Sequence, residues 1–174
     1  MDTDITLTVD GQEHRLTVDT RTTVLDLLRE RLGSTSAKKG CDHGQCGACT
    51  VLLDGRRTLS CLMLAVTQDG SSLTTADGLA PEGELHPVAR AFLDRDAFQC
   101  GYCTPGQICS AVGVLDEVRA GMPSAASTDV AAEVGLDVLD EVEVAERMSG
   151  NLCRCGAYVN IVRAVREAGR EAAR

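Results

Sequence analysis

The sequence predicts an α+β chain, in which a small mixed sheet with one helix is followed by a bundle of four short helices. Three observations lead to this prediction. Strand-like alternation surrounds an Asp-Gly pair near the N-terminus, a second Asp-Gly pair lies at residues 54–55, and the apolar spacing becomes helical after residue 86. We therefore expect one domain over residues 1–78 and a second domain over residues 79–174.

The first half is expected to begin with a β-hairpin, because residues 4–9 and 13–18 alternate polar and apolar side chains around Asp10-Gly11. Residues 22–33 then predict a short amphipathic helix, since their apolar side chains recur with the helical period. The ends of this helix are marked by Thr22 or Thr23 as the N-cap and by Gly33 as the C-terminal stop.

A second hairpin is predicted over residues 50–61, because the strand-like residues there flank Asp54-Gly55. Residues 71–75 supply a final strand to the same sheet. A connector rich in glycine and proline follows at residues 76–87 and separates this half from the helical one.

The second half predicts four helices. The first covers residues 86–98, and the second starts with Thr104 as N-cap and Pro105 at the first helical position. The last two are expected at about residues 138–148 and 158–170, after a small, polar, poorly patterned stretch at 121–137 that reads mostly as a linker.

Composition restricts the class of protein. Hydrophobic residues make up 44% of the chain but aromatic residues only 2%, so the core must consist mostly of Val, Leu, Ile and Ala. The formal net charge of −9 argues against a nucleic-acid partner, which requires clustered Lys and Arg. The N-terminus has no signal-peptide pattern and no apolar run is long enough to cross a bilayer, so we expect a cytoplasmic chain without membrane insertion.

The chain contains nine cysteines, a high number for 174 residues. In a reducing compartment, clustered cysteines are more often metal ligands or redox groups than disulfides. Three of them lie in a glycine-rich loop as Cys41-x4-Cys46-x2-Cys49, and Cys61 follows twelve positions later. This is the plant-type [2Fe–2S] spacing, whereas zinc loops usually carry symmetric Cys-x2-Cys pairs, so an iron–sulfur cluster is the preferred interpretation.

A second set consists of Cys100-x2-Cys103 and Cys153-x-Cys155. On spacing alone, zinc, a dithiol redox pair or a cluster could use these residues. Both pairs precede predicted helices, whose N-termini favour an anionic cluster, so a second cluster is preferred over zinc. Cys109 has no partner in either set and is expected to be a buried hydrophobe. His43 is expected to be a surface loop residue, and His86 a helix cap.

Four segments, in this order, resemble the small iron–sulfur subunit of the molybdenum hydroxylases, the xanthine dehydrogenase/aldehyde oxidoreductase family. They are "KKGCDHGQCGACTVLLDG", "GELHPVARAF", "QCGYCTPG" and "SGNLCRCGAYVNIVRAV". The resemblance covers nearly the whole chain. It implies a plant-type ferredoxin-like (β-grasp) domain followed by an all-α four-helix [2Fe–2S]-binding domain.

The resemblance also implies two [2Fe–2S] clusters. One would be bound by Cys41, Cys46, Cys49 and Cys61, and the other by Cys100, Cys103, Cys153 and Cys155. The second cluster would lie nearest a molybdopterin, with Gln99 and Cys155 close to the pterin, and the first would face a flavin. Both of these cofactors would belong to partners: a medium subunit with FAD and a large subunit with molybdopterin, in its cytosine dinucleotide form.

The function implied is electron transfer from the molybdopterin centre through both clusters to FAD, with no acid, base or nucleophile supplied by this chain. "RMSGNLCRCGAY" and the long linker most resemble aldehyde oxidoreductase small subunits. The alternative is the iron–sulfur subunit of a xanthine, carbon monoxide or N-heterocycle dehydrogenase. Two rival classes are a free-standing ferredoxin, which would need only the first half, and a structural zinc protein.

Overall fold

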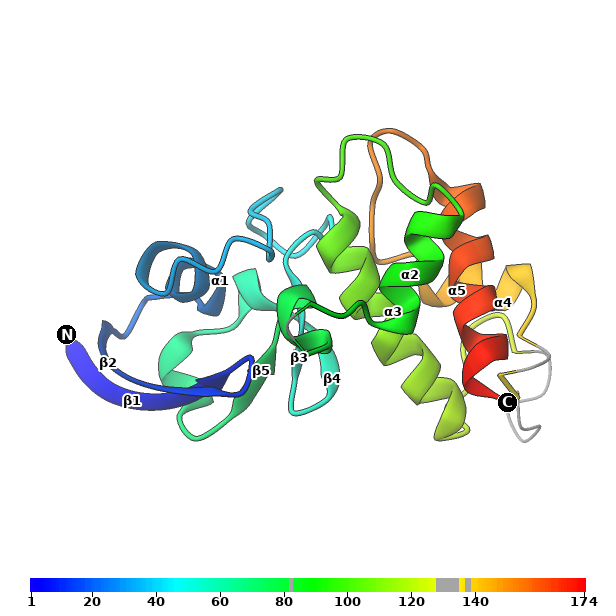
Figure 1. The fold of residues 1–174 in the computed structure, drawn as a ribbon. Helices are drawn as coiled ribbons and strands as arrows, with labels where there is room; N and C mark the ends of the chain where they lie inside the picture. The colour runs from blue at the N-terminus through cyan, green and yellow to red at the C-terminus, as the bar shows by residue number, and fades with distance from the viewer. Residues whose placement is uncertain (82, 128–134, 137–138) are drawn as a thin grey trace.

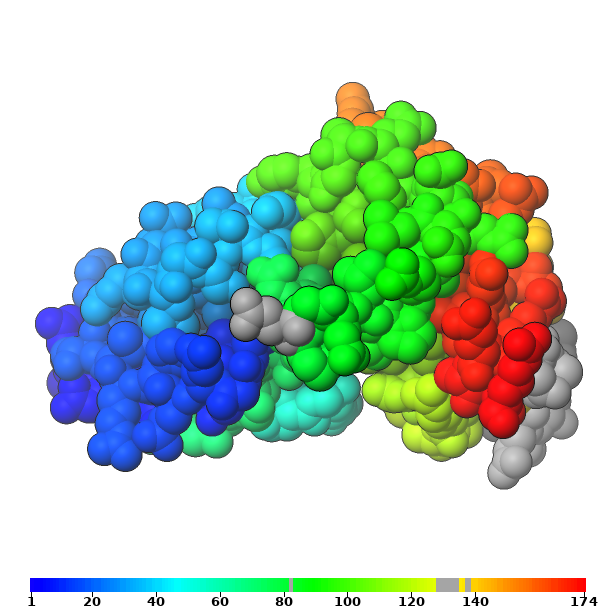
Figure 2. Space-filling view, in the orientation of Figure 1, coloured from blue at the N-terminus to red at the C-terminus, as the bar shows by residue number. Residues whose placement is uncertain are grey.

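A computed structural model describes residues 1–81, 83–127, 135–136 and 139–174. The elements up to Leu79 form a sheet half and those from α2 onward form a helical half, and the two lie side by side with the termini at opposite ends (Figure 1). In the space-filling view the two halves are adjoining lobes of one elongated body (Figure 2). Among the described residues, no helix is long and apolar enough to cross a membrane.

The sheet half contains five strands in the order β2-β1-β5-β3-β4. They are β1 (Asp2–Val9), β2 (Gln12–Asp19), β3 (Thr50–Leu53), β4 (Arg56–Leu59) and β5 (Ser72–Thr74). Strand β5 pairs parallel to β1 and antiparallel to β3, so it joins the two hairpins into one sheet.

Both predicted hairpins are confirmed. Each turns through two residues with positive φ, 50° and 80° at Asp10 and Gly11, and 47° and 80° at Asp54 and Gly55. These are the conformations that a two-residue hairpin turn of the favoured hand requires, and Asp-Gly is a sequence that adopts them at little cost.

The predicted helix at 22–33 forms, but it is irregular. It consists of one α-helical turn, α1 (Val24–Asp26), followed by a π-helical turn, η1 (Leu27–Arg31), and it is capped by the Thr23 side chain. Leu27 and Leu28 of the widened turn are fully buried, as are Val24 and Leu25 of the α-helical turn. Gly33 ends the segment with φ of 69°, as predicted.

The helical half contains α2 (Pro87–Asp94), α3 (Thr104–Arg119), α4 (Glu141–Arg147) and α5 (Tyr158–Ala172). Helices α2 and α5 pack together. The core of the helical half includes Phe92 of α2, Val114 of α3, and Ile161 and Val165 of α5. His86 caps α2 as predicted, because its Nδ1 accepts the Val88 N–H at 3.2 Å. Most of the predicted 121–137 linker lies outside the described residues.

The predicted capping role of Thr104 is wrong. Thr104 is already the first residue of α3, and its hydroxyl is buried with no hydrogen-bond partner among the described residues. An N-cap needs extended backbone, whereas Cys103 before it already has helical φ and ψ of −81° and −11°. The cysteine loop therefore enters the helix one residue earlier than a capping threonine would.

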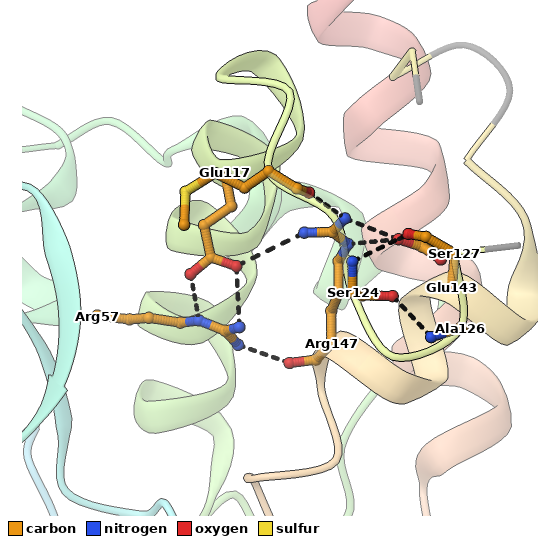
Figure 3. Close-up of polar contacts among 8 residues, drawn as sticks. Arg57, Glu117, Ser124, Ala126, Ser127, Glu143 and Arg147 are labelled. Atoms are coloured by element: carbon orange, nitrogen blue, oxygen red, sulfur yellow. Dashed lines mark hydrogen bonds and ion pairs between the residues drawn. The ribbon is translucent and has the colours of Figure 1, made fainter. Parts of the chain in front are cut away.

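Helix α3 joins the two halves, because it packs across β3 and β4. Arg57 of β4 makes a two-pronged contact with Glu117 of α3 at 2.7 and 2.9 Å, and its Nη1 donates to the carbonyl of Arg147 at 2.6 Å (Figure 3). Arg147 in turn pairs with Glu143 at 2.7 Å, and its side chain is only 2% exposed. Removing one partner of such a buried pair strongly destabilises the protein, because the other charge stays buried without compensation.

Candidate iron–sulfur centres

The first candidate centre is a loop that follows η1 and leads into β3. Gly44 and Gly47 have φ of 81° and 71°, so the backbone reverses twice within a few residues. A side chain at Gly40 is excluded, because a Cβ there would lie 2.7 Å from the Cys46 sulfur. The glycines thus allow the chain to fold tightly around its own cysteines.

The four thiols of this centre form two pairs. The Cys41 thiol lies beside that of Cys46, and the Cys61 thiol, which comes from the far end of β4, lies beside that of Cys49, close enough for each pair to interact. Cys61 thus closes the site from the side opposite the loop, although it lies outside the loop in the sequence.

Backbone N–H groups favour the anionic form of one member of this set. The N–H of Gln45 donates to the Cys41 sulfur at 3.2 Å, and the N–H of His43 is the main reason that the pKa of Cys41 falls to about 6. In contrast, burial and the neighbouring Cys49 raise the pKa of Cys61 to about 12. A bound metal would therefore have to displace a proton from Cys61.

The second candidate centre is formed by two loops of the helical half, which precede α3 and α5. The thiols of Cys103 and Cys153 lie close enough to interact, and Cys100 also lies close enough to act on the Cys103 charge. Cys155 is half-buried, packs against the helical core and directs its backbone N–H toward the Cys153 sulfur. The structure therefore brings both parts of the second set together.

The electrostatics of this centre resemble those of the first. Burial raises the pKa of Cys153, but the N–H of Ala157 at 3.4 Å, the Cys103 side chain and the N–H groups of Cys155 and Gly156 together outweigh it, so the net pKa is lowered. Burial raises the pKa of Cys103 to about 12, although the side-chain amide of Gln107 acts in the opposite direction.

The donor set fits binuclear clusters. Within the described part of the chain, no three His, Cys, Asp or Glu side chains surround a position for one metal ion. A [2Fe–2S] cluster instead takes two protein ligands at each of two irons, and closely paired thiols meet that requirement. All eight candidate ligands are thiols, the soft donors that iron–sulfur clusters use.

The two centres are adjacent. A cleft of about 370 Å³ is lined by Cys46 of the first set and by Cys100, Cys103 and Cys153 of the second. The N–H of Leu152, next to Cys153, donates to the carbonyl of Cys46 at 2.9 Å. A single backbone hydrogen bond therefore links a loop of one centre to a loop of the other.

A buried polar cluster, which we call the Asn151 junction, holds these loops in place; sequence reasoning assigned its residues no role. The Asn151 Nδ2 donates to the carbonyls of Gly47 at 2.9 Å and Gly106 at 3.2 Å, and Oδ1 accepts from Ser110 at 2.6 Å. The Asn151 carbonyl accepts from Gln107 at 2.9 Å. The only sequence signal was a pair of polar residues at helical spacing, Gln107 and Ser110, among apolar neighbours in α3.

The remaining predicted residues lie as follows. Gln99 is exposed in the loop directly before Cys100. Cys109 is fully buried, as predicted, and burial raises the pKa of its thiol to about 12. His43 is exposed in the first loop, also as predicted, and its ring contacts the Cys41 carbonyl.

Two family models match the chain, one after the other. Residues 7–74 match the 2Fe-2S iron-sulfur cluster binding domain, and residues 75–166 match the [2Fe-2S] binding domain. Among curated relatives, the aldehyde oxidoreductase iron-sulfur-binding subunit PaoA of Escherichia coli K12 is 54% identical over 169 residues, which cover 96% of this chain and 72% of that protein. The nicotinate dehydrogenase small FeS subunit of Eubacterium barkeri is 40% identical, over 94% of this chain and 93% of its own length.

Solved structures lead to the same conclusion. Quinoline 2-oxidoreductase from Pseudomonas putida 86 matches with a TM-score of 0.78 and 34% identity, over 99% of both chains. The aldehyde oxidoreductase of Desulfovibrio desulfuricans ATCC 27774 matches with a TM-score of 0.80 and 35% identity, over 97% of this chain but 17% of that one. These neighbours confirm the predicted fold, a ferredoxin-like domain followed by a helical [2Fe–2S] domain. The chain belongs to the xanthine dehydrogenase/aldehyde oxidoreductase family of molybdenum hydroxylases, as an iron–sulfur subunit that transfers electrons within an oxidoreductase complex.

Proposed function

We propose that this chain relays single electrons between two partner-bound cofactors through two [2Fe–2S] clusters of its own. Cys41, Cys46, Cys49 and Cys61 hold one cluster, and Cys100, Cys103, Cys153 and Cys155 hold the other. The observation that most supports this proposal is the closeness of the two cysteine sets, which line one cleft and share the Leu152–Cys46 hydrogen bond. Each cluster, when bound, supplies one-electron redox chemistry.

The protein's own part in this function is to bind the clusters and fix their positions. Paired thiols supply the ligands, and backbone N–H groups directed at Cys41 and Cys153 stabilise negative charge on sulfur. The Asn151 junction fixes the spacing of the two loops, because its hydrogen bonds span both halves of the chain. No side chain here needs to act as acid, base or nucleophile.

The electron donor in this proposal is a molybdopterin centre, in its cytosine dinucleotide form, in a large partner subunit. The acceptor is FAD in a medium subunit, which would complete a heterotrimer. Exposed apolar side chains flank both centres, which supports burial against partners: Tyr102, Leu152, Tyr158 and Val159 near the second, and Leu62 and Leu64 near the first. Gln99, exposed beside Cys100, would face the pterin.

An aldehyde is the proposed substrate of the complex. The 54% identity to the aldehyde oxidoreductase subunit of Escherichia coli supports it, since the caffeine and nicotinate dehydrogenase subunits are 41% and 40% identical. The second candidate is an N-heterocycle, which those two relatives favour. We further propose a domain boundary between residues 78 and 79. We also propose that the chain works in the cytoplasm, where reduced cysteines are available for cluster assembly.

The proposal is tested by chemical analysis and EPR of the purified chain and its complex. About four iron and four sulfide per chain are expected for two [2Fe–2S] clusters. Cys46→Ser and Cys103→Ser should each remove one EPR signal and leave the other. Zinc without sulfide would contradict cluster binding, and loss of both signals in either variant would contradict two separate sites. Purification without flavin and molybdenum subunits would contradict the relay between them.

A further inference from the structure

Tyr102 connects a loop of the second cysteine set to the loop of the first. It lies between Cys100 and Cys103 in the sequence, and its hydroxyl donates to the carbonyl of Lys39 at 2.8 Å. Lys39 belongs to the first loop and precedes Cys41 by two positions. The bond joins residues that are 63 positions apart, so it forms only when the two halves pack together.

The acceptor end of this bond is anchored to the rest of the sheet half. The Lys39 ammonium group pairs with Asp26 of α1 at 2.8 Å. Next to it, the N–H of Lys38 donates to the carbonyl of Ala48 at 3.0 Å and closes the loop across its base. The Lys39 carbonyl is therefore an ordered point of attachment for Tyr102.

Two other bonds between the loops lie close together. The N–H of Leu152 donates to the carbonyl of Cys46, and the side chain of Asn151 donates to the carbonyl of Gly47, both at 2.9 Å. Because Cys46 and Gly47 are adjacent, these two bonds attach the first loop at one place, and both come from the loop before α5. Tyr102, in the loop before α3, attaches it at a second place.

Burial in a core does not account for an aromatic residue at position 102. Tyr102 is 49% exposed, although aromatic residues make up only 2% of the chain. Its neighbour Gly101 has φ of 78°, a conformation that favours glycine, and its ring lines the cleft between the two cysteine sets. The loop therefore presents Tyr102 to the cleft, where its hydroxyl reaches the first loop.

We propose that Tyr102 is a positioning residue that fixes the separation of the two clusters. The rate of electron transfer between two centres falls steeply with their distance, so a small movement of one loop changes it. A site keeps its geometry when supporting hydrogen bonds hold the segments that carry its ligands. Tyr102 provides such a bond, because the loop that it attaches carries Cys100 and Cys103. The inference rests on the proposed function, which supplies the two clusters.

The test is pulsed EPR of the fully reduced, cluster-loaded chain, in which the magnetic interaction between the two clusters weakens with the cube of their separation. Tyr102→Phe removes the hydroxyl and keeps the ring, so it should weaken this interaction or spread it over a range of values. Hydrogen exchange followed by mass spectrometry is the second measurement. Exchange should become faster in peptides that cover residues 38–41 and 100–103.

Tyr158→Phe is the matched control, because it removes the only other tyrosine hydroxyl of the chain. That hydroxyl accepts the Cys153 N–H at 2.8 Å, a bond within the helical half, so its loss should leave the interaction between the clusters unchanged. An equal change in both variants, or an unchanged interaction in Tyr102→Phe, would overturn the inference alone. A wild-type chain without two cluster signals would overturn the proposed function as well.

Discussion

At the scale of single residues, Asn151 connects the two halves of the chain through its hydrogen bonds. It is 5% exposed, and its side chain and carbonyl bind partners from the first cysteine loop and from α3. An apolar side chain at this position would remove the acceptor of the Ser110 hydroxyl. It would also remove one donor to the Gly47 carbonyl, which still accepts from Thr50. The residue therefore couples the folding of one half to that of the other.

Replacing Asn151 by leucine should lower the free energy of unfolding by about 1–3 kcal/mol, because the buried Ser110 hydroxyl loses its acceptor and the carbonyls of Gly47 and Gly106 each lose one donor. Chemical denaturation of the variant measures the change. Asn160→Ala is the control, since Asn160 makes a single exposed contact, to the Asp96 carbonyl at 3.3 Å. Its cost should stay below about 1 kcal/mol, and equal costs for the two variants would argue against the junction.

The residues that could be predicted from the sequence are those whose chemistry demands one residue type at a fixed spacing. Cys41, Cys46 and Cys49 could be grouped because they share one loop. Asn151 and Gln107 could not be recognised, because their roles depend on contacts between distant segments; the Asn151–Gly47 bond spans 104 positions. The pairing of the thiols could likewise not be predicted, because it depends on the fold that places Cys61 beside Cys49.

At the scale of elements, α3 is held against the sheet by charge as well as by packing. Glu117 lies between Arg57 of β4 and Arg147 of α4, at 2.7 Å and 3.7 Å respectively. Both arginines are partly or fully withdrawn from solvent, so the carboxylate compensates charge that water reaches poorly. This network fixes α3, which begins at the second cysteine set, relative to the strands that follow the first.

Glu117→Gln should therefore lower the free energy of unfolding by about 2 kcal/mol, less than for a fully buried pair because the side chains are partly exposed. Asp116→Asn, on the same helix and in an exposed pair with Arg119, should cost about 0–1 kcal/mol. Thermal and urea unfolding compare the two variants. Similar costs for both would mean that the network adds no more than a surface pair.

The cap of α2 makes stability depend on pH. Burial lowers the pKa of His86 below its ordinary value of 6.5; Arg119 lowers it further, and Asp116 acts in the opposite direction. The unfolded chain then takes up the His86 proton more readily than the folded chain. This contribution to stability is present above the ordinary pKa and is lost as pH falls from there through the lower folded-state value.

His86→Asn keeps a capping acceptor but removes the titration. The difference in unfolding free energy between wild type and variant should be constant near neutral pH and should move against the wild type as pH falls below about 6.5. Urea denaturation across a pH series measures it. A difference independent of pH would contradict a cap that depends on neutral His86.

At the scale of the whole molecule, the fold keeps one thiol apart from the other eight. Cys109 is 0% exposed and lies in α3, six positions after Cys103, and the charges that act on its thiol are those of Asp10 and Asp77. The other eight cysteines are grouped in the two centres. This separation allows the complete set of proposed ligands to be counted in one measurement.

In the cluster-loaded chain, no thiol should react rapidly with a thiol reagent, because the eight proposed ligands would be bound to iron and Cys109 is buried with its pKa raised to about 12. After denaturation with a chelator and removal of the released sulfide and of any reductant, all nine thiols should react, and Cys109→Ala should reduce this count to eight. Colorimetric thiol titration gives both numbers. If one thiol of the loaded chain reacts rapidly, that result would contradict the assignment of all eight cysteines as ligands.

The elements of each half could be predicted because their signals are local. The Asp-Gly turns, the helical periods and the His86 cap are determined by neighbouring residues, and these predictions are confirmed, although the helix predicted over residues 86–98 ends at Asp94. Two others depended on context. The helix predicted at residues 22–33 continues as a π-helical turn at Leu27–Arg31, and Thr104 could cap α3 only if its own backbone were extended. The contact between the two halves was the hardest feature to predict from the sequence, because glycine backbone groups and single polar side chains form much of it.

The hydrogen bond from Leu152 to Cys46 has a consequence for how this protein can change over evolutionary time. The link is made by the backbone, and the Leu152 side chain itself is 51% exposed. Every residue except proline has the required N–H. The surface of position 152 is therefore free to adapt to a different partner while the connection beneath it stays the same, and proline is the one substitution that would break it.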